Sequence, residues 1–387
     1  MSAWKKCRIG DLCDTISETY KRTDNMVVLI NTSDVLEGEV LNHTPVPNEN
    51  LKGQFKKTFQ RDDILYSEIR PANKRFAFID FEDTSKYIAS TKLMVLRPRK
   101  DAVLPLFLYA ILKSRDVLEE LQHLAETRSG TFPQITFSSE LAPMEIMLPD
   151  FTTQKQIVGI LSAIEDKIRL NTAINENLEQ QAQTLFKDMI ADVQEQVPFT
   201  SVIQVLGGGT PKTGNQEYWN GEIPFFTPKD VGNPYVLTTE KSITPLGLDN
   251  CNSRLYPVNT VFLTARGTVG KVSLAGVQMA MNQSCYALAG KNGLHQIIVY
   301  HYVLETVKAL KHKASGAVFD AIITRDFDTE SVPALSSEQI KSYIAVAEPI
   351  YSEILNRTLE NQRLSALRDT LLPKLMNGEI DVSAVKI

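Results

Sequence analysis

The sequence is poor in cysteine and histidine and contains no long apolar run. Its 387 residues include four cysteines, none in C-x-x-C spacing, and five scattered histidines. This pattern excludes the paired-cysteine zinc and redox motifs, so we expect reduced thiols and no metal site. No apolar run is long enough to span a bilayer, and the first ten residues lack the apolar core of a signal peptide. We therefore expect a cytoplasmic protein without membrane contact.

The sequence also lacks the excess of positive charge that is typical of proteins coating nucleic acid. Its formal net charge is −5, from 41 basic and 46 acidic residues. Residues 149–196 hold eight acidic and four basic side chains, and residues 333–387 hold seven and six, so the whole negative charge lies in these two segments. The remainder is neutral, and any binding to DNA must use local clusters of Lys and Arg.

A heptad pattern predicts one long helix within residues 149–196. Apolar or amide side chains alternate at spacings of four and three at Ile157, Leu161, Ile164, Ile168, Asn171, Asn175, Leu178, Ala182, Leu185 and Met189. Thr152 or Thr153 can cap the helix, and about 36 residues without Gly or Pro would be ~54 Å long. The two asparagines are of the kind that fixes the register between paired helices.

A second long helix is expected within residues 333–387. The same spacing recurs at Ile340, Ile344, Ala347, Tyr351, Ile354 and Thr358, and continues with a shift at Leu364, Leu367, Leu371 and Leu375. Pro349 should kink or restart this helix, and Gly378 should end it.

Each helix follows a globular segment, and the two segments, residues 1–148 and 197–332, repeat one order of elements. Each is predicted to contain a hairpin. When the two hairpins are compared, Arg266 matches Arg70 and Lys271 matches Arg75. The chain is therefore domain, helix, domain, helix. We expect an α/β (α+β) fold with two globular domains separated by two long antiparallel coiled-coil helices, an internal duplication with pseudo-two-fold symmetry.

Three strings resemble the specificity subunits of type I restriction–modification systems. QKQIVGILSAIEDKIRLNTAINENLEQQAQTLFK, which begins at Gln154, is similar to their central conserved helix. LRDTLLPKLMNGEI, from Leu367 to Ile380, is similar to their C-terminal conserved helix. GGTPKTGNQEYWNGEIPFFTPKDV, from Gly208, resembles the opening of many of their target recognition domains. The resemblance covers essentially the whole chain, is looser in the first domain, and departs from the family at Pro349.

The resemblance implies a subunit without catalysis that reads double-stranded DNA. Target recognition domains at residues 1–148 and 197–332 would each read one half of a bipartite, asymmetric target. The helices at 149–196 and 333–387 would set the spacing and dock two methylation subunits, with restriction/translocase subunits in the full complex. The complex would methylate adenine and restrict DNA, with S-adenosylmethionine, ATP and Mg bound by the partner subunits and no cofactor on this chain.

Loop residues of the types that contact phosphates and base edges are the candidate DNA-binding residues. In the first domain these are Arg70, Asn73, Lys74, Arg75, Lys92, Arg128, Thr131, Phe132 and Gln134. In the second they are Thr210, Lys212, Lys229, Arg266, Thr268, Lys271, Asn282, Gln283, Lys313 and Ser315. The paired arginines at 70 and 266 rank first because both stand in the predicted hairpin turn. The seam residues of the two helices should pack against each other. The flanking residues Leu170, Ile174 and Phe186 are therefore the candidates for docking the methylation subunits.

Catalytic motifs are incomplete. The string Asn233-Pro234-Tyr235-Val236 lacks the second proline of amino-group methyltransferases, and GTVGK at 267–271 is half a P-loop, with Val272 where Ser or Thr must stand. Two other functions stay open: the specificity module of another restriction–modification type with a fused nuclease–methylase partner, and a coiled-coil adaptor that binds protein.

Overall fold

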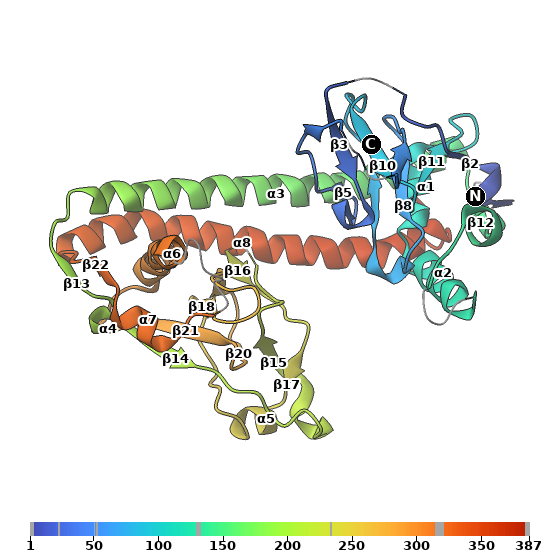
Figure 1. Ribbon diagram of the computed structural model, residues 1–387. Coiled ribbons are helices and arrows are strands. Elements are labelled where there is room, and N and C mark those ends of the chain that lie inside the picture. Colours follow the sequence, from blue (N-terminus) through green and yellow to red (C-terminus); the bar gives the residue numbers. More distant parts are fainter. Residues whose placement is uncertain are drawn as a thin grey trace. The chain divides into compact units, whose positions relative to one another are not determined.

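The computed structural model describes residues 4–21, 24–49, 51, 53–128, 133–232, 234–313 and 321–383. The chain forms two compact units, one made of Met1–Asp166 with Leu364–Ile387 and the other of Lys167–Arg363. Two long helices, α3 (Phe151–Ala191) and α8 (Ser337–Met376), each contribute to both units (Figure 1).

The first unit contains an antiparallel sheet and a smaller mixed sheet. The antiparallel sheet has the order β2 (Cys13–Ile16), β11 (Leu93–Pro98), β8 (Ile64–Ser67), β9 (Phe76–Phe78). The mixed sheet has the order β6 (Val46–Pro47), β3 (Met26–Ile30), β10 (Tyr87–Ser90), β7 (Phe55–Lys57). Two further pairs join β1 (Lys5–Arg8) to β12 (Glu145–Leu148) and β4 (Val35–Leu36) to β5 (Glu39–Val40). The helices are α1 (Pro105–Leu112) and α2 (Arg115–Arg128), with short turns η1 (Ile9–Asp11), η2 (Thr32–Asp34), η3 (Pro71–Asn73) and η4 (Phe137–Leu141).

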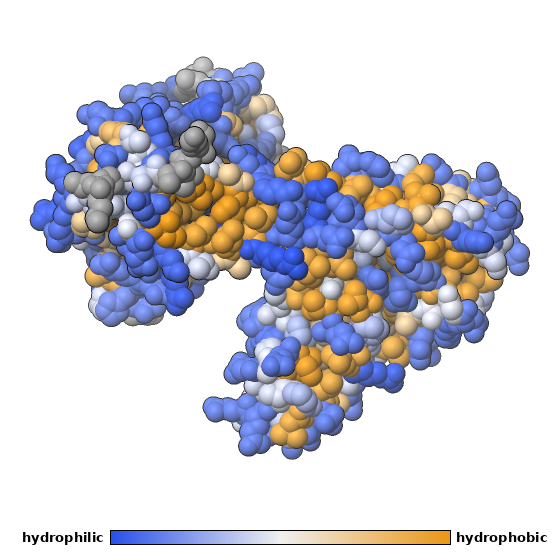
Figure 2. Space-filling view, turned by 180° about the vertical axis from the view of Figure 1, so that it is seen from behind, coloured by the Kyte–Doolittle hydropathy of each residue, from blue (hydrophilic) through white to orange (hydrophobic). Residues whose placement is uncertain are grey.

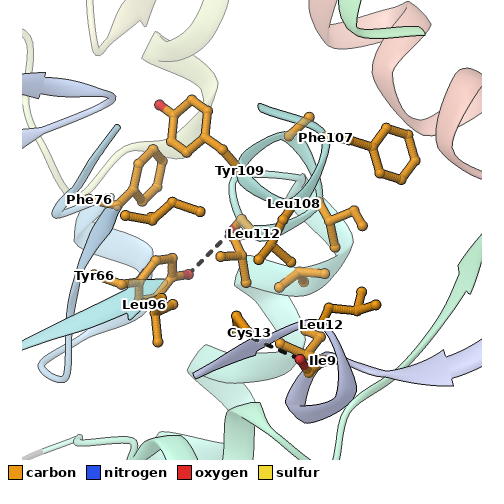
Figure 3. Close-up of a cluster of buried hydrophobic side chains, with 14 of the residues drawn as sticks. Ile9, Leu12, Cys13, Tyr66, Phe76, Leu96, Phe107, Leu108, Tyr109 and Leu112 are labelled. Carbon is orange, nitrogen blue, oxygen red and sulfur yellow. Dashed lines mark hydrogen bonds between the residues drawn. The ribbon is translucent and has the colours of Figure 1, made fainter. Parts of the chain in front are cut away.

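The core of the first unit includes the ends of both long helices. Tyr66 on β8 stacks on Phe76 on β9, with ring centroids 5.7 Å apart, and its hydroxyl donates to the carbonyl of Leu112 at 3.3 Å (Figure 3). Leu161 of α3 and Leu375 of α8 are buried in the same cluster. Burying one such leucine contributes about 1.5–3 kcal/mol. The helix ends therefore stabilise this domain and are not separate spacers attached to it.

The second unit contains a five-stranded and a three-stranded sheet. The larger has the order β14 (Ile203–Gly207), β21 (Cys285–Gly290), β18 (Val261–Thr264), β19 (Val272–Ala275), β16 (Tyr235–Val236). The smaller has the order β17 (Ser242–Ile243), β15 (Trp219–Phe226), β20 (Ala280–Met281), and β13 (Gln196–Pro198) pairs with β22 (Ser331–Pro333). The shorter helices are α4 (Phe199–Val202), α5 (Pro245–Asp249), α6 (Gln296–Lys313), α7 (Thr324–Asp328) and η5 (Gln216–Tyr218).

The two units repeat one topology. The order β2-β11-β8-β9 in the first recurs as β14-β21-β18-β19 in the second, and the pair β1–β12 recurs as β13–β22. Each also has a parallel strand pair, β3 with β10 and β15 with β20. The predicted α/β fold and internal duplication are therefore confirmed.

Within the second unit, α3 and α8 lie side by side and run antiparallel. The Asn175 Nδ2 donates to the Thr358 Oγ1 at 3.3 Å, and the carbonyl of Ala182 accepts from the Tyr343 hydroxyl at 3.0 Å. Higher residue numbers on α3 thus meet lower numbers on α8, as the repeated order of domain and helix predicted.

The prediction of the helix cap was wrong. The Asp150 Oδ1 accepts from the backbone N–H of Thr153 at 2.9 Å, so the aspartate just before the helix caps α3 in place of Thr152 or Thr153. A side-chain oxygen at this position satisfies one of the free N–H groups of the first turn.

The predicted seam of α3 departs from the buried face after Asn175. Glu179 and Phe186 are buried there, one residue after the predicted Leu178 and Leu185, and Leu185 is 43% exposed, whereas the predicted Ala182 is buried. An α-helix has 3.6 residues per turn, so a strict 3.5-residue repeat drifts around it by ~20° per heptad. Sequence spacing alone does not show where the buried face shifts by one residue.

Helix α8 passes through Pro349 without the predicted restart. Pro349 is exposed, while Ala347 and Tyr351 on either side of it are buried. The backbone group that loses its hydrogen bond to proline can therefore bind water, and the buried neighbours hold the helix together.

Candidate nucleic-acid interface

The first domain has a three-segment backbone frame around Glu68, at the end of β8. The N–H of Glu68 donates to the carbonyl of Lys92 at 3.0 Å, and its own carbonyl accepts from the N–H of Ile135 at 2.8 Å. The N–H of Ser67 donates to the carbonyl of Arg75 at 2.8 Å and closes the β8–β9 turn. The frame thus places the turn, the start of β11 and the segment at 133–135 next to one another.

The second domain contains the same frame around Ala265. Its N–H donates to the carbonyl of Ser284 at 2.8 Å, and its carbonyl accepts from the N–H of Ile322 at 2.9 Å. The turn closes through the N–H of Thr264, which donates to the carbonyl of Lys271 at 2.9 Å. The match of Lys271 to Arg75 is therefore confirmed.

The match of Arg266 to Arg70 needs a correction. Arg266 forms an isolated β-bridge with Ala321, as Ile69 does with Gln134, so Arg266 is equivalent to Ile69. Counting from the strand ends then makes the next residue, Gly267, equivalent to Arg70. Both of these have left-handed backbones, with φ of 82° for Gly267 and 45° for Arg70. The turn of the first domain is one residue longer, so counting backwards from the second strand gave the wrong partner.

In the first domain, the frame brings together two predicted residues and one that was not predicted. Gln134 Nε2 donates to Glu68 Oε2 at 3.0 Å, and Lys92 Nζ lies 3.4 Å from Gln134 Oε1 and 3.6 Å from the same Glu68 oxygen. Glu68 was missed because only basic and neutral polar side chains were considered for DNA contact. Its position directly before the turn was the available signal.

Arg70 stands beside this cluster in the turn η3. The Arg70 side chain is exposed, and its guanidinium group forms no hydrogen bond or ion pair with any other residue that the structure describes. Asn73, in the same turn, is also exposed. A charged group with no protein partner is available to a phosphate or a base edge.

Three other candidates of the first domain have protein partners. Lys74 pairs with Glu37 at 2.9 Å, and Arg128 Nη1 pairs with Glu140 at 2.8 Å. The Arg75 guanidinium donates to the carbonyls of residues 33 and 35, so it holds the turn to a neighbouring loop. Thr131 and Phe132 lie outside the described residues.

In the second domain, a glycine run packs directly against the loop before β21. A Cβ on Gly208 would overlap the backbone of Asn282, which explains the glycine by close packing. The Thr210 hydroxyl then bonds the Gln283 side chain, and Asn282 Oδ1 accepts from the N–H of Ser284 at 3.0 Å. These polar candidates are therefore next to the frame, because Ser284 is part of it.

The basic candidates of the second domain divide into paired and unpaired groups. Lys229 pairs with Glu240 at 3.3 Å, and Lys313 pairs with the buried Glu330 at 2.5 Å. For Lys212, Arg266 and Lys271, no side-chain hydrogen bond or ion pair connects them to the part of the chain that is described.

One remaining candidate of the second domain, Thr268, lies in the β18–β19 turn. The Thr268 hydroxyl donates to the carbonyl of Pro228 at 3.1 Å, which joins the β18–β19 turn to the loop carrying Lys229. Ser315, and Asn233 of the incomplete methyltransferase string, lie outside the described residues.

The prediction that Phe186 is free for docking was wrong. Phe186 is 1% exposed and stacks on His301 of α6, with ring centroids 4.6 Å apart. Leu170 is 56% exposed and Ile174 is half-buried, so these two stay available. On the face drawn in Figure 2, hydrophobic residues are exposed among hydrophilic ones.

His301 belongs to a buried polar cluster between α6, α3 and α8. Its Nε2 lies 2.7 Å from the Tyr343 hydroxyl and 3.2 Å from that of Tyr351. Burial lowers the pKa of His301 to about 3, with a smaller contribution from the charge of Lys308. Burial also raises the pKa of Glu179, which accepts from the Tyr300 hydroxyl at 2.7 Å. This buried network attaches the second domain to its helices.

The described ranges contain neither a cluster of metal-binding side chains nor a membrane-spanning helix. No group of three or more His, Cys, Asp or Glu side chains is placed to hold a metal ion there. Over the same residues, no helix is long and apolar enough to cross a bilayer.

Comparison with known proteins gives matches over the whole chain. A family model described as the type I restriction modification DNA specificity domain matches residues 1–180 and again residues 194–344. The HindI specificity subunit of Haemophilus influenzae is 31% identical, over 98% of this chain and 100% of its own length. The MjaIX specificity subunit of Methanocaldococcus jannaschii is 29% identical over 42% of this chain and 39% of its own. The S subunit of a type I restriction–modification system from M. genitalium has a TM-score of 0.54 at 14% identity, with 97% of this chain and 96% of that chain covered, so the two share a fold.

Proposed function

This chain belongs to the type I restriction modification DNA specificity family, and from that premise we propose that each of its domains reads one half of a split, asymmetric DNA target. As a specificity subunit it carries no catalysis of its own. Recognition on this chain directs adenine methylation and restriction by other subunits.

The observation that carries the proposal is the repeated frame with different side chains. The backbone hydrogen bonds around Glu68 recur around Ala265, so both domains can present the same segments to DNA in the same way. The side chains on the frame differ between the domains, and different side chains read different base edges. The two half-sites of the DNA target should therefore differ in sequence.

The electrostatics favour selective over general DNA binding. The net charge of −5 provides no long-range attraction to phosphate. Arg70 and Arg266, whose side chains have no hydrogen-bond or ion-pair partner among the described residues, act locally at the frame. The complex therefore needs base contacts, or its partner subunits, for tight binding.

We further propose that the helices dock two methylation subunits. Leu170, Leu185 and Val346 are between 43% and 56% exposed on α3 and α8, and apolar side chains exposed on long helices are suited to a partner helix. Restriction/translocase subunits complete the assembly, and S-adenosylmethionine, ATP and Mg are bound by these partners. The assembly acts in the cytoplasm.

Two rival functions make different predictions for one experiment. The chain is assembled with its methylation subunits, and the methylated motif is found by sequencing the host genome with and without the gene. The assembly is then titrated with duplex DNA carrying the motif, and with duplexes in which either half is scrambled. We expect tight, salt-dependent binding that is lost on scrambling either half.

Equal affinity for all duplexes, with no change in genome methylation, would support a protein-binding adaptor instead. If one polypeptide carrying both nuclease and methylase co-purifies with the chain, the alternative restriction–modification type is supported.

A further inference from the structure

Three equivalent frame positions carry unlike side chains in the two domains. The backbone hydrogen bonds make Glu68 equivalent to Ala265 and Lys92 equivalent to Ser284. In the first domain the N–H of Glu68 donates to the carbonyl of Lys92, and in the second the N–H of Ala265 donates to the carbonyl of Ser284. Gln134 is likewise equivalent to Ala321, because Gln134 forms the isolated bridge with Ile69 and Ala321 forms the one with Arg266. The first domain thus has an acid, a base and an amide where the second has alanine, serine and alanine. We call the three side chains of the first domain the frame triad.

The frame triad is not required for the fold. The second domain forms the same backbone hydrogen bonds, at 2.8 and 2.9 Å, with Ala265 and Ser284 in place of the charged residues. Lys92 is 47% exposed at its side chain, and an ion pair with such an exposed partner adds little to the stability of a protein. A structural role therefore does not account for the triad.

We propose that the frame triad reads a G·C base pair in the half-site of the first domain. The proposal rests on the proposed function and adds the residues and the base pair. Lys92 donates to the guanine acceptors, Glu68 accepts from the cytosine amino group, and Gln134 positions Glu68.

The chemistry of the triad matches the major-groove edge of this base pair. Guanine presents the acceptors N7 and O6, and the paired cytosine presents its N4 amino donor beside them. The Lys92 ammonium and the Glu68 carboxylate lie 3.6 Å apart, a donor next to an acceptor in the complementary order. A carboxylate has several acceptor positions, so Glu68 can keep the hydrogen bond from Gln134 and accept another.

Glu68 is held in place for this role. Its side chain is 17% exposed and accepts from Gln134 Nε2 at 3.0 Å, so the carboxylate loses little freedom on binding. Lys57 Nζ donates to the carbonyls of Thr91 and Leu93 at 3.1 and 2.8 Å, and so fixes the backbone on both sides of Lys92.

The test uses the full chain assembled with its methylation subunits and a duplex library that is randomised over the half-site of the first domain. The variants are Glu68→Gln and Lys92→Met. The matched control is Glu145→Gln, which breaks the pair between Glu145 and Lys6, 2.6 Å apart, in another sheet of the same domain. Selected sequences and thermal unfolding are measured for each.

For both variants we expect preference for G·C to fall about five- to 150-fold at one position of the first half-site. The second half-site and the gap should not change, and Glu145→Gln should select the wild-type sequences. Unaltered selection by Glu68→Gln would overturn the proposal, as would equal weakening for every sequence, which indicates a phosphate contact. A lower unfolding temperature that accounts for the whole loss would also overturn it. If the wild-type assembly selects no sequence, it is the proposed function that fails.

Discussion

Asn171 on α3 donates a hydrogen bond of 2.8 Å from its Nδ2 to the Oδ1 of Asn361 on α8. Asn171 is fully buried, and its own Oδ1 accepts from Arg357 Nη1 at 2.9 Å. One buried amide therefore bonds two partly buried side chains of the opposite helix. A shift of either helix by one turn would break these bonds, so this contact fixes the register of the pair.

Replacing Asn171 with Leu should destabilise the chain by about 0.5–1.5 kcal/mol, because Arg357 Nη1 and Asn361 Oδ1 lose their bonds to Asn171, while Arg357 keeps its pair with Glu353 at 2.7 Å. The double variant Asn171→Leu with Asn361→Leu should recover part of the loss, since it removes the Oδ1 that was left without its donor. Urea unfolding followed by circular dichroism measures both. A single variant as stable as the wild type would show that the amide bonds do not hold the helix pair.

The low pKa of His301 predicts a loss of stability in mild acid. Its folded pKa of about 3 lies below the ordinary value of 6.5, so the unfolded chain binds more protons between these values. Stability therefore falls as the pH is lowered through that range. From this group alone we expect about 2 kcal/mol less stability at pH 5 than at pH 7.

The variant His301→Phe should remove that part of the pH dependence, and Tyr343 keeps a partner in the carbonyl of Ala182. His312→Phe, at the exposed end of the same helix, is the matched control. Glu179 acts in the opposite direction, because its raised pKa means that folding takes up protons, so only the difference between variants is diagnostic. Equal pH profiles for wild type and His301→Phe would contradict the assignment.

Arg70 offers a test of the turn itself. Its backbone is left-handed at φ 45°, so Arg70→Gly removes the guanidinium without strain. If the guanidinium reads guanine, affinity should fall by ~1–3 kcal/mol at one position of the first half-site. If it holds phosphate, all sequences should weaken alike and the salt slope should fall by about one.

Arg266→Ala should do the same for the second half-site, and binding titrations at several salt concentrations distinguish the two roles. If neither variant changes DNA binding, both turns are structural.

The sequence predicted the fold well and the site only in part. The heptad spacing and the repeated order of elements were visible because periodic burial determines both. The burial of Phe186 was not visible, since it depends on where the helix face shifts by one residue. The cap was misassigned because Asp150 and the threonines after it are all favoured N-cap types. Glu68 was missed because only basic and neutral polar side chains were considered, and because its contacts with Lys92 and Gln134 join residues that are far apart in the chain. Such neighbours follow from strand register, which sequence spacing does not give.

The helix pair should act as a ruler between the half-sites. The structure indicates that an insertion must be made in both helices, because α3 and α8 are hydrogen-bonded along the second unit. Four residues inserted after Asp166 and four after Arg363, where the two units meet along the chain, lengthen the helices by ~6 Å. At ~3.4 Å per base pair, the gap in the methylated motif should grow by one or two base pairs. An unchanged gap with both half-sites intact would show that the helices do not set the spacing.

The central claim, one half-site for each domain, is tested most directly by exchanging the first domain. Residues 1–148 are replaced by those of a relative, with Leu161 and Leu375 retained because they belong to the domain core. The methylated motif is then read by sequencing the genome of a host that carries the exchanged gene. We predict a new first half-site, with the second half-site and the gap as in the parent. A change in both half-sites, or in the gap, would contradict the account.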